Sequence, residues 1–471
     1  MLCRKLFAAI ICLCLLIAHG EWSWANAEDE LSDRVNLLVN DRMYHELIPG
    51  LALAVIKDGK ILKLGTYGSA DMESKIPVTT NTVFRIGSVS KQFVATAIMM
   101  LVEQGRIGLD DLASKYLDDT PKSWQKITVR NLLTHTSGIP DFNNENIRME
   151  TSPGDYDHRV VKALAKCRLH FAPGDEWRYS NSNYHLLGMI IQKITGKPYD
   201  DFLRDRIFEP LGMTQTTVFK EGETYPNLAT GYRWHDGFHR TDAPFGITAG
   251  GSILSTISDM AKWDAALYTE HLLKRSSLNQ MWTPVRLNDG MTWRYGFGWG
   301  VARINDHLIV SHSGNVFGFS SSIYRAVDDQ LTVIALDNRF DSNEAAEKLV
   351  YKTLQIYLPK GPDYQPIPDN EPKVTERVRN INNRQDRGKL KPVDFTPAVW
   401  AELSPWQRQC KDDRKKTDPA LSLFLLEHTN ESNGRSYRYS FQYKFGTILL
   451  HVVFDEHDKI AVWKVEDVDL K

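Results

Sequence analysis

The stretch "FRIGSVSKQFVATAIMMLVEQG", residues 84–105, puts two hydroxyls and a lysine at the start of an apolar segment. From Phe93 onward the apolar residues leave little polar face, so the pattern predicts a buried helix that stops at Gly105. Ser88 and Lys91 lie three residues apart and therefore share a face of the first helical turn. Lysine is rarely buried, so an ammonium group at the mouth of a buried helix, beside a serine, needs a chemical reason.

That reason is available if the lysine serves as a base. A serine hydroxyl becomes a nucleophile when a base removes its proton. Apolar neighbours desolvate an ammonium group and lower its pKa, which makes the neutral amine accessible. The helix N-terminus adds unpaired N–H groups and favours negative charge. Ser88 and Lys91 are therefore a candidate nucleophile and base, although the spacing alone fits equally an N-capping serine and a lysine that reaches solvent.

A second motif lies in "FAPGDEWRYSN", residues 171–181, on a predicted loop that enters a helix. Tyr179 near two cationic groups is expected to have a lowered pKa and to exchange protons. Asn181 offers both a donor and an acceptor to a substrate amide. We expect Tyr179 to be catalytic and Asn181 to bind substrate.

A third motif is "VSHSG", residues 310–314, on a predicted strand that carries His312 and Ser313 and ends at Gly314. A strand edge pairs with an extended acyl substrate, and glycine allows its backbone to approach closely. The backbone N–H of the next residue, Asn315, together with that of the serine nucleophile, is a candidate oxyanion hole. We expect all four residues to bind substrate.

The motifs S-x-x-K, Y-x-N and H-[ST]-G, in this order, resemble the serine β-lactamase and penicillin-binding-protein superfamily. The branch with Y-x-N is that of class C β-lactamases, D-Ala-D-Ala carboxypeptidases and esterases. The flanking phrases "LLTHTSGIPDF", "ITAGGSILSTISDMAKW" and "YGFGWG" are also similar, and the resemblance covers roughly residues 30–357. It implies that Ser88 is acylated, that Lys91 and Tyr179 form the base and acid pair, and that Asn181 orients Lys91 and substrate.

One departure from class C β-lactamases bears on the substrate. His312 stands where those enzymes typically carry lysine, and histidine is at best partly charged at neutral pH. The H-[ST]-G form is more similar to D-Ala-D-Ala peptidases, esterases and D-aminopeptidases. We therefore expect an exported serine hydrolase that cleaves an amide or ester of a D-Ala-D-Ala-type peptide, a D-amino-acid derivative or a small ester. The alternatives are a class C-like β-lactamase and a non-catalytic ligand sensor of the penicillin-binding type.

No metal or organic cofactor is implied, because acyl transfer of this kind needs only protein groups. His235 and His239 flank a predicted turn without a third ligand nearby, and "LLTHTSG", which contains His135, is expected to be a structural turn.

The fold expected for residues 28–358 is an α/β (α+β) β-lactamase-like domain. Strand patterns lie near both ends of this region and helical patterns between them, which predicts an antiparallel sheet built from N- and C-terminal strands, flanked by helices, with an all-helical subdomain. Within it, residues 251–268 are predicted to be one helix, capped by Ser258 or Thr256. The Pro-rich residues 359–373 are a predicted linker. Residues 374–471 are a predicted small α+β module, which resembles the cystatin-like rolls of exported bacterial hydrolases.

Length, charge and the N-terminus set the remaining expectations. The chain has 471 residues, 42% hydrophobic and 25% charged, with a formal net charge of -2, which disfavours nucleic acid as a partner. Residues 1–27 combine a basic start, a short apolar core and a small-x-small site, as in a secretory signal peptide, so a periplasmic or secreted protein without stable membrane insertion after cleavage is expected; the alternative is that the segment stays uncleaved as a membrane anchor. The expected partner is a small-molecule or peptide substrate, such as a cell-wall peptide. The oligomeric state is not indicated.

Overall fold

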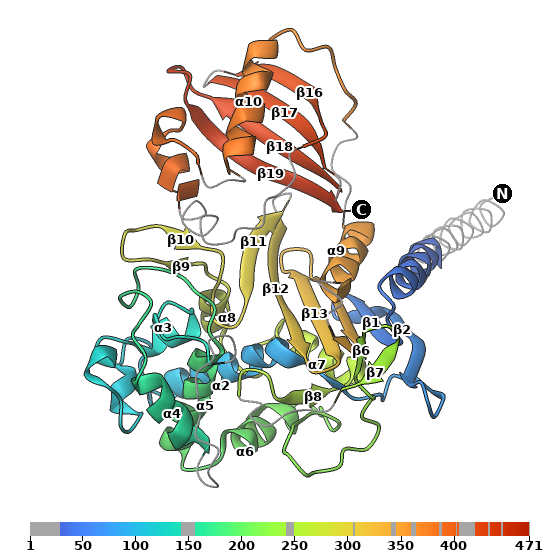
Figure 1. Cartoon of the computed structure of the whole chain (residues 1–471), viewed down its shortest axis with the longest axis vertical. Coiled ribbons are helices and arrows are strands. Elements are labelled where there is room, and N and C mark those ends of the chain that lie inside the picture. Colours follow the sequence, from blue (N-terminus) through green and yellow to red (C-terminus); the bar gives the residue numbers. More distant parts are fainter. Residues whose placement is uncertain are drawn as a thin grey trace, which may run out of the picture.

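The protein consists of a larger body, residues 29–358, and a smaller body, residues 364–470 (Figure 1). The computed structural model describes residues 29–142, 156–241, 249–304, 307–340, 345–358, 364–385, 389–401, 403–404, 420–431, 434–443 and 446–470. Among the described residues, two large hydrophobic clusters and a small one around Trp293 lie in the larger body, and a separate cluster fills the smaller one. The predicted signal peptide, residues 1–27, lies outside the described residues and stays a prediction. Among the helices that are described, none is both long and apolar enough to cross a membrane.

The larger body is built around a seven-stranded sheet, whose strands are β1 Gly50–Lys57, β2 Lys60–Asp71, β3 Ile76–Pro77, β11 Gly300–Ile304, β12 His307–Val316, β13 Phe319–Ala326 and β14 Leu331–Asp337. The strand order is β11–β12–β13–β14–β1–β2–β3, and neighbouring strands run antiparallel. β1 pairs with β14, from Leu51 opposite Asp337 to Lys57 opposite Leu331. The predicted sharing of one antiparallel sheet by N- and C-terminal strands is therefore confirmed.

Both faces of this sheet are covered. In β1, Leu51, Leu53 and Val55 point into the cluster formed with the helix over residues 29–45 and with α9 Ala345–Tyr357. The alternating Ala52, Ala54 and Ile56 join the larger cluster on the opposite face. Burial on both faces explains why β1 is apolar at successive positions instead of alternating with polar residues.

The opposite face carries a helical region whose central element is α2 Lys91–Glu103, buried from Lys91 to Leu101. Gly105, at φ +67°, follows its end, as predicted. The other helices and turns of this body are η2 Ala113–Lys115, η3 Lys122–Trp124, α3 Val129–Leu133, α4 Tyr156–Ala165, α5 Asn181–Thr195, α6 Tyr199–Leu203, the π-helical turn η4 Arg204–Phe208, α7 Ile257–Ala266 and α8 Arg275–Met281.

The single helix predicted over residues 251–268 is wrong at its start. Residues Ile253–Ser255 form strand β8, which pairs with β4 Phe84–Arg85 and β5 Thr217–Val218. The Thr256 side chain then accepts from the Asp259 N–H at 3.1 Å, so α7 begins only at Ile257. The pairing with β4 matters for function because β4 leads directly into the segment that carries Ser88.

Two further small sheets flank the central one. β6 Tyr232–Trp234 and β7 Phe238–Arg240 form a hairpin that extends to β15 Arg339–Phe340. β9 Val285–Arg286 pairs with β10 Thr292–Trp293.

The smaller body is a four-stranded antiparallel sheet with one long helix on it, composed of β16 Ser422–Glu431, β17 Gly434–Tyr443, β18 Gly446–Phe454, β19 Ile460–Leu470, α10 Pro372–Gln385 and the turn η5 Pro392–Asp394. Strand β19 contacts β11 and α9 of the larger body. Within the predicted linker, the Ile367 N–H donates to the Leu425 carbonyl and α10 already begins at Pro372, so this segment is partly attached to the smaller body.

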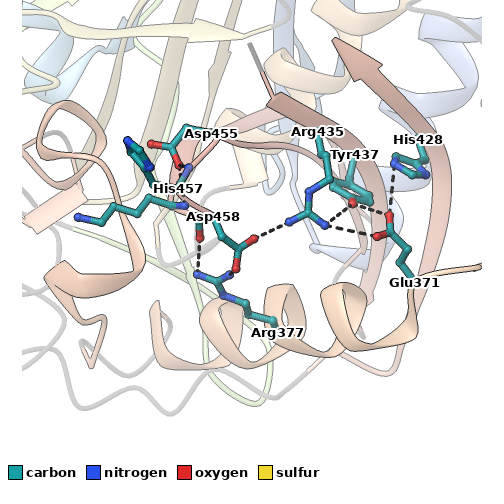
Figure 2. Close-up of polar contacts among 9 residues, drawn as sticks. Glu371, Arg377, His428, Arg435, Tyr437, Asp455, His457 and Asp458 are labelled. Carbon is teal, nitrogen blue, oxygen red and sulfur yellow. Dashed lines mark hydrogen bonds and ion pairs between the residues drawn. The ribbon is translucent and has the colours of Figure 1, made fainter. Parts of the chain in front are cut away.

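A polar network ties α10 to the strands of the smaller body (Figure 2). Arg435 contacts Glu371 at 3.3 Å and Asp458 at 2.5 Å, and Arg377 donates to Asp458 at 2.6 Å. The Tyr437 hydroxyl donates to Glu371 at 2.6 Å. Each charged group named here has an oppositely charged partner or a hydrogen-bond donor. We therefore interpret the network as one that stabilises the packing of α10 on the sheet.

Candidate active site

Ser88 lies in a 3₁₀ turn, η1 Gly87–Ser90, between β4 and α2. Three contacts hold this turn. The Ile86 N–H donates to the Ile253 carbonyl at 3.0 Å, the Ser321 hydroxyl donates to the Ile86 carbonyl at 2.8 Å, and Ser90 Oγ accepts from the Ile253 N–H at 3.1 Å. The nucleophile candidate is thus fixed by β8 and β13, two strands that lie far from it in the sequence.

Lys91 is the first residue of α2 and is fully buried. Its Nζ lies 3.0 Å from Ser88 Oγ, 2.9 Å from Asn181 Oδ1 and 2.8 Å from the Gly250 carbonyl oxygen. The alternative of a lysine that reaches solvent beside a capping serine is therefore wrong, because the ammonium is enclosed and no side chain caps α2.

The three partners of Lys91 suit both of its protonation states. A neutral amine has two N–H donors and one lone pair. The Gly250 carbonyl can only accept, and Asn181 also presents its oxygen, because its amide nitrogen donates to Asp141 Oδ2 at 3.0 Å. These two acceptors receive hydrogen bonds from both N–H groups of the neutral amine, which leaves its lone pair directed at Ser88. The protonated form matches three donors to three acceptors.

Burial lowers the pKa of Lys91 to about 7, and the negative charge of Asp141 partly opposes this effect. Lysine in this position therefore exchanges a proton near neutral pH. The sequence predicted the desolvation but missed the part played by Asp141 and Gly250. Asp141 lies three residues after the "THTSG" phrase, and no local pattern marks it as a neighbour of Lys91.

Tyr179 donates its phenolic proton to Ser88 Oγ at 2.8 Å, and Lys91 Nζ lies 4.9 Å from the centre of its ring. The expectation of a lowered pKa is wrong. Burial raises the pKa of Tyr179 well above its ordinary value, and the hydrogen bond to Ser88 offsets only part of that effect. Tyr179 is therefore a neutral phenol and a proton donor to Ser88 at physiological pH.

His312 lies on β12 and is buried. Its Nδ1 lies 2.6 Å from the Ser313 carbonyl oxygen, which can only accept, so Nδ1 carries the proton. Its Nε2 then accepts from the Tyr295 hydroxyl at 3.0 Å. Burial and the nearby Lys91 lower the pKa of His312 to about 3, so this ring is neutral and both nitrogens are occupied within the protein.

The end of β12 runs past its neighbour β11. The two strands pair only as far as Gly300 opposite Ser311, whereas pairing with β13 continues to Val316. Residues 312–316 therefore present an edge that β11 does not cover. On this segment Ser313 and Asn315 are exposed, and the Asn315 side chain is held by the Ser320 hydroxyl at 2.7 Å.

Backbone positions here are close enough for an oxyanion hole. A Cβ on Gly314 would lie 2.9 Å from the Ser88 nitrogen, and a Cβ on Gly87, at φ +49°, would lie 3.0 Å from the Asn315 nitrogen. The two N–H groups that the sequence analysis selected are thus neighbours across the contact between η1 and β12.

The eight site residues chosen from sequence are therefore brought together by η1, α2, the irregular segment that carries Tyr179, the start of α5 and the end of β12. Sequence analysis also missed Tyr295, from the "YGFGWG" phrase, which fixes His312. His235 and His239 contact each other through the His235 carbonyl in the β6–β7 hairpin. No cluster of metal-ligating side chains occurs within the ranges that the structure describes.

The model of the family described as Beta-lactamase matches residues 35–358. The chain belongs to this family. It is a serine hydrolase of the β-lactamase and penicillin-binding-protein superfamily, and the β-lactamase-like fold is confirmed.

Relatives and solved structures agree. The chain is 33% identical over 323 residues to penicillin-binding protein 4* of Bacillus subtilis, covering 64% of this chain and 70% of the relative. It is 28% identical to protein flp of Staphylococcus aureus, covering 68% of this chain and 66% of the relative. Similar solved structures include the D-amino acid amidase from Ochrobactrum anthropi, complexed with L-phenylalanine amide, with 29% identity, a TM-score of 0.60 and coverage of 69% of this chain and 98% of that one.

A structural similarity that includes the smaller body is found with one solved structure. The octameric penicillin-binding protein homologue from Pyrococcus abyssi has a TM-score of 0.62 and 22% identity, and the match covers 93% of this chain and 99% of that one. This coverage extends beyond the family region into residues of the smaller body.

Gly314→Ala tests the close packing of β12 on η1. The new Cβ would lie 2.3 Å from the Ile86 oxygen and 2.6 Å from Ser321 Oγ, so we expect a loss of about 1–3 kcal/mol in the free energy of unfolding. Gly300→Ala on the neighbouring strand is the matched control, because its Cβ would meet nothing closer than 3.3 Å. Urea denaturation compares the two variants, and equal stabilities would contradict the packing.

Proposed function

We propose that this protein cleaves amide or ester bonds through an acyl-enzyme on Ser88, with D-amino-acid derivatives, including D-Ala-D-Ala-type peptides, or small esters as substrates. The observation that carries the proposal is the environment of Ser88 Oγ, which lies within hydrogen-bond distance of both Lys91 Nζ and the Tyr179 hydroxyl. A nucleophile between a base and a proton donor is the arrangement that acyl transfer requires.

In the first half of the reaction, neutral Lys91 takes the proton of Ser88 while Oγ bonds to the substrate carbonyl carbon. The N–H groups of Ser88 and Asn315 stabilise the oxyanion that forms. The bond to the leaving nitrogen or oxygen then breaks, and the leaving atom takes the phenolic proton of Tyr179. The Lys91 ammonium reprotonates the phenolate, which is short-lived because burial raises the pKa of Tyr179.

In the second half, water takes the place of the leaving group. As the water oxygen bonds to the acyl carbon, the water molecule gives a proton to the Tyr179 oxygen. In the same step Tyr179 gives its own phenolic proton to the neutral Lys91 amine. The bond from the acyl carbon to Ser88 Oγ breaks, and Lys91 returns the proton to that oxygen. All groups end in their starting states, so the cycle needs no group besides water and these side chains.

The neutral His312 supports amides and esters over substrates that need a cation beside the scissile bond. Both its ring nitrogens are engaged, so it offers no charge to a substrate carboxylate, whether of a β-lactam or of a D-Ala-D-Ala peptide, and uncharged D-amino-acid amides and small esters are favoured over both. Similarity to a D-amino acid amidase points in the same direction. This argues against the alternative of a dedicated class C-like β-lactamase. We expect β-lactams to acylate Ser88 slowly and the resulting acyl-enzyme to be hydrolysed slowly.

Replacement of the nucleophile is the direct test. Ser88→Ala is expected to lose the covalent adduct with a fluorophosphonate probe and to lower kcat by at least about 10³-fold on D-amino-acid amides, D-Ala-D-Ala peptides or nitrophenyl esters. Intact mass and peptide mapping locate the adduct. Ser90→Ala, which removes the other serine of the η1 turn, should keep the label at position 88. A folded wild-type protein that no probe labels would overturn the proposal.

The pH dependence of acylation follows from Lys91. Its pKa is lowered to about 7 and its base form is the neutral amine, so the rate of Ser88 acylation should rise with pH up to about 7 and level off above it. Stopped assays with an uncharged fluorophosphonate between pH 5 and 9 measure this, with circular dichroism as the folding control. Lys91→Arg should lower the rate by about 10²- to 10⁴-fold. A rate independent of pH would rule out Lys91 as the base.

His312→Lys tests the source of selectivity. A cation at this position should raise kcat/KM for a carboxylate-bearing cephalosporin, relative to an uncharged ester, by about 10- to 100-fold. His307→Lys, on the same strand but beside Asp329, is the matched control and should leave the ratio unchanged. An unchanged ratio in both variants would show that position 312 does not set selectivity.

A further inference from the structure

The backbone segment that carries Tyr179 does not by itself fix the position of the Tyr179 side chain. Residues 176–180 form neither helix nor strand, so the backbone there has no regular hydrogen-bond ladder to fix it. Yet the phenol must stay within hydrogen-bond distance of Ser88. A side chain on such a segment is held only by contacts from neighbouring elements.

Those contacts converge on His135, which follows α3. Its backbone carbonyl accepts from the Arg178 N–H at 3.0 Å, and its ring Nδ1 accepts from the Ser180 N–H at 3.3 Å. One residue thus bonds the positions immediately before and after Tyr179. The His135 ring also lies against the Tyr179 ring, with centroids 4.4 Å apart and planes tilted by 40°.

We propose that His135 is the positioning residue for Tyr179, holding the phenol at Ser88 by bonding both neighbours of Tyr179 and packing against its ring. This inference rests on the proposed role of Tyr179 in acyl transfer. It assigns a role in the reaction to a residue that sequence analysis placed in a structural turn.

Two costly features of His135 support a functional reason for its presence. Its φ is +59°, in the left-handed region that only a few per cent of non-glycine residues adopt, histidine more often than most. It is also fully buried, and its Nε2 has no hydrogen-bond partner among the described residues. Strain and an unpaired polar atom in one residue are expected where the site gains from them.

The protonation state agrees with this role. Nδ1 receives the Ser180 N–H and lies 3.2 Å from the Asn183 amide nitrogen, so it must be unprotonated. Burial, with the positive charge of Lys91, lowers the pKa of His135 well below its ordinary value and keeps the ring neutral. A neutral His135 ring can accept the hydrogen bond from the Ser180 N–H and does not place a second cation beside Lys91.

The test is a double-mutant cycle. His135→Leu removes the ring acceptor and disfavours the positive φ, and we expect kcat to fall about 10- to 100-fold with KM changed less than about threefold. In a Tyr179→Phe background the same substitution should cost little, because the group that it positions is already absent. A cost of equal size in both backgrounds would overturn the proposal.

Two further variants separate positioning from general loss of structure. His135→Asn keeps an acceptor and tolerates positive φ, so it should retain more activity than His135→Leu, and it remains informative if the leucine variant does not fold. His185→Leu alters another buried histidine, on α5 beside Phe142, and should leave kcat per labelled site unchanged. Rates are normalised to the fraction of Ser88 that a fluorophosphonate labels.

Labelling of the wild-type protein keeps the two proposals distinct. If Ser88 is not acylated, the proposed function fails. If Ser88 is acylated and turns over, but His135→Leu and His135→Asn match the wild type in kcat, only the positioning role fails.

Discussion

A lysine amine fully enclosed by protein atoms is the constraint on which the rest of the site depends. Lys91 keeps a usable lone pair at neutral pH only because burial removes the solvation of its charge. Burial would be prohibitive without partners, and the oxygens of Ser88, Asn181 and Gly250 supply them in both protonation states. The apolar α2 and the sheet that covers it are therefore part of the chemistry, because they keep water away from one nitrogen.

The same enclosure sets the properties of the aromatic groups around Lys91. The phenol of Tyr179 stays protonated and the rings of His312 and His135 stay neutral, because burial disfavours charge in each and Lys91 adds to the effect on the two histidines. The site thus contains one exchangeable cation whose direct hydrogen-bond partners are neutral, with the Asp141 carboxylate behind Asn181. Such an arrangement favours moving a proton over binding an anion, in keeping with amide and ester substrates.

The sequence was informative where a residue type and its spacing carry the chemistry. Ser88, Lys91, Tyr179 and His312 were identified because a nucleophile, a base and a strand glycine leave recognisable local patterns. Asp141, Gly250 and Tyr295 were missed because they act through contacts that only the tertiary fold creates. The lowered pKa expected for Tyr179 failed for a related reason, since proximity of cations was visible in the motifs but complete burial of the phenol was not. Strand β8 was read as helix because its three residues gain their stability from partners far away in sequence.

The pairing of β1 with β14 has a consequence for how the molecule is made. Residues 51–57 find their partners only at residues 331–337, so nearly the whole larger body must leave the ribosome before the sheet closes. Until then β1 has an unsatisfied edge and two apolar faces, which favours slow folding and association with other unfolded chains. A chain truncated before residue 331 would keep the residues that hold the Ser88 turn but would lack β14, so the central sheet would be split between β13 and β1.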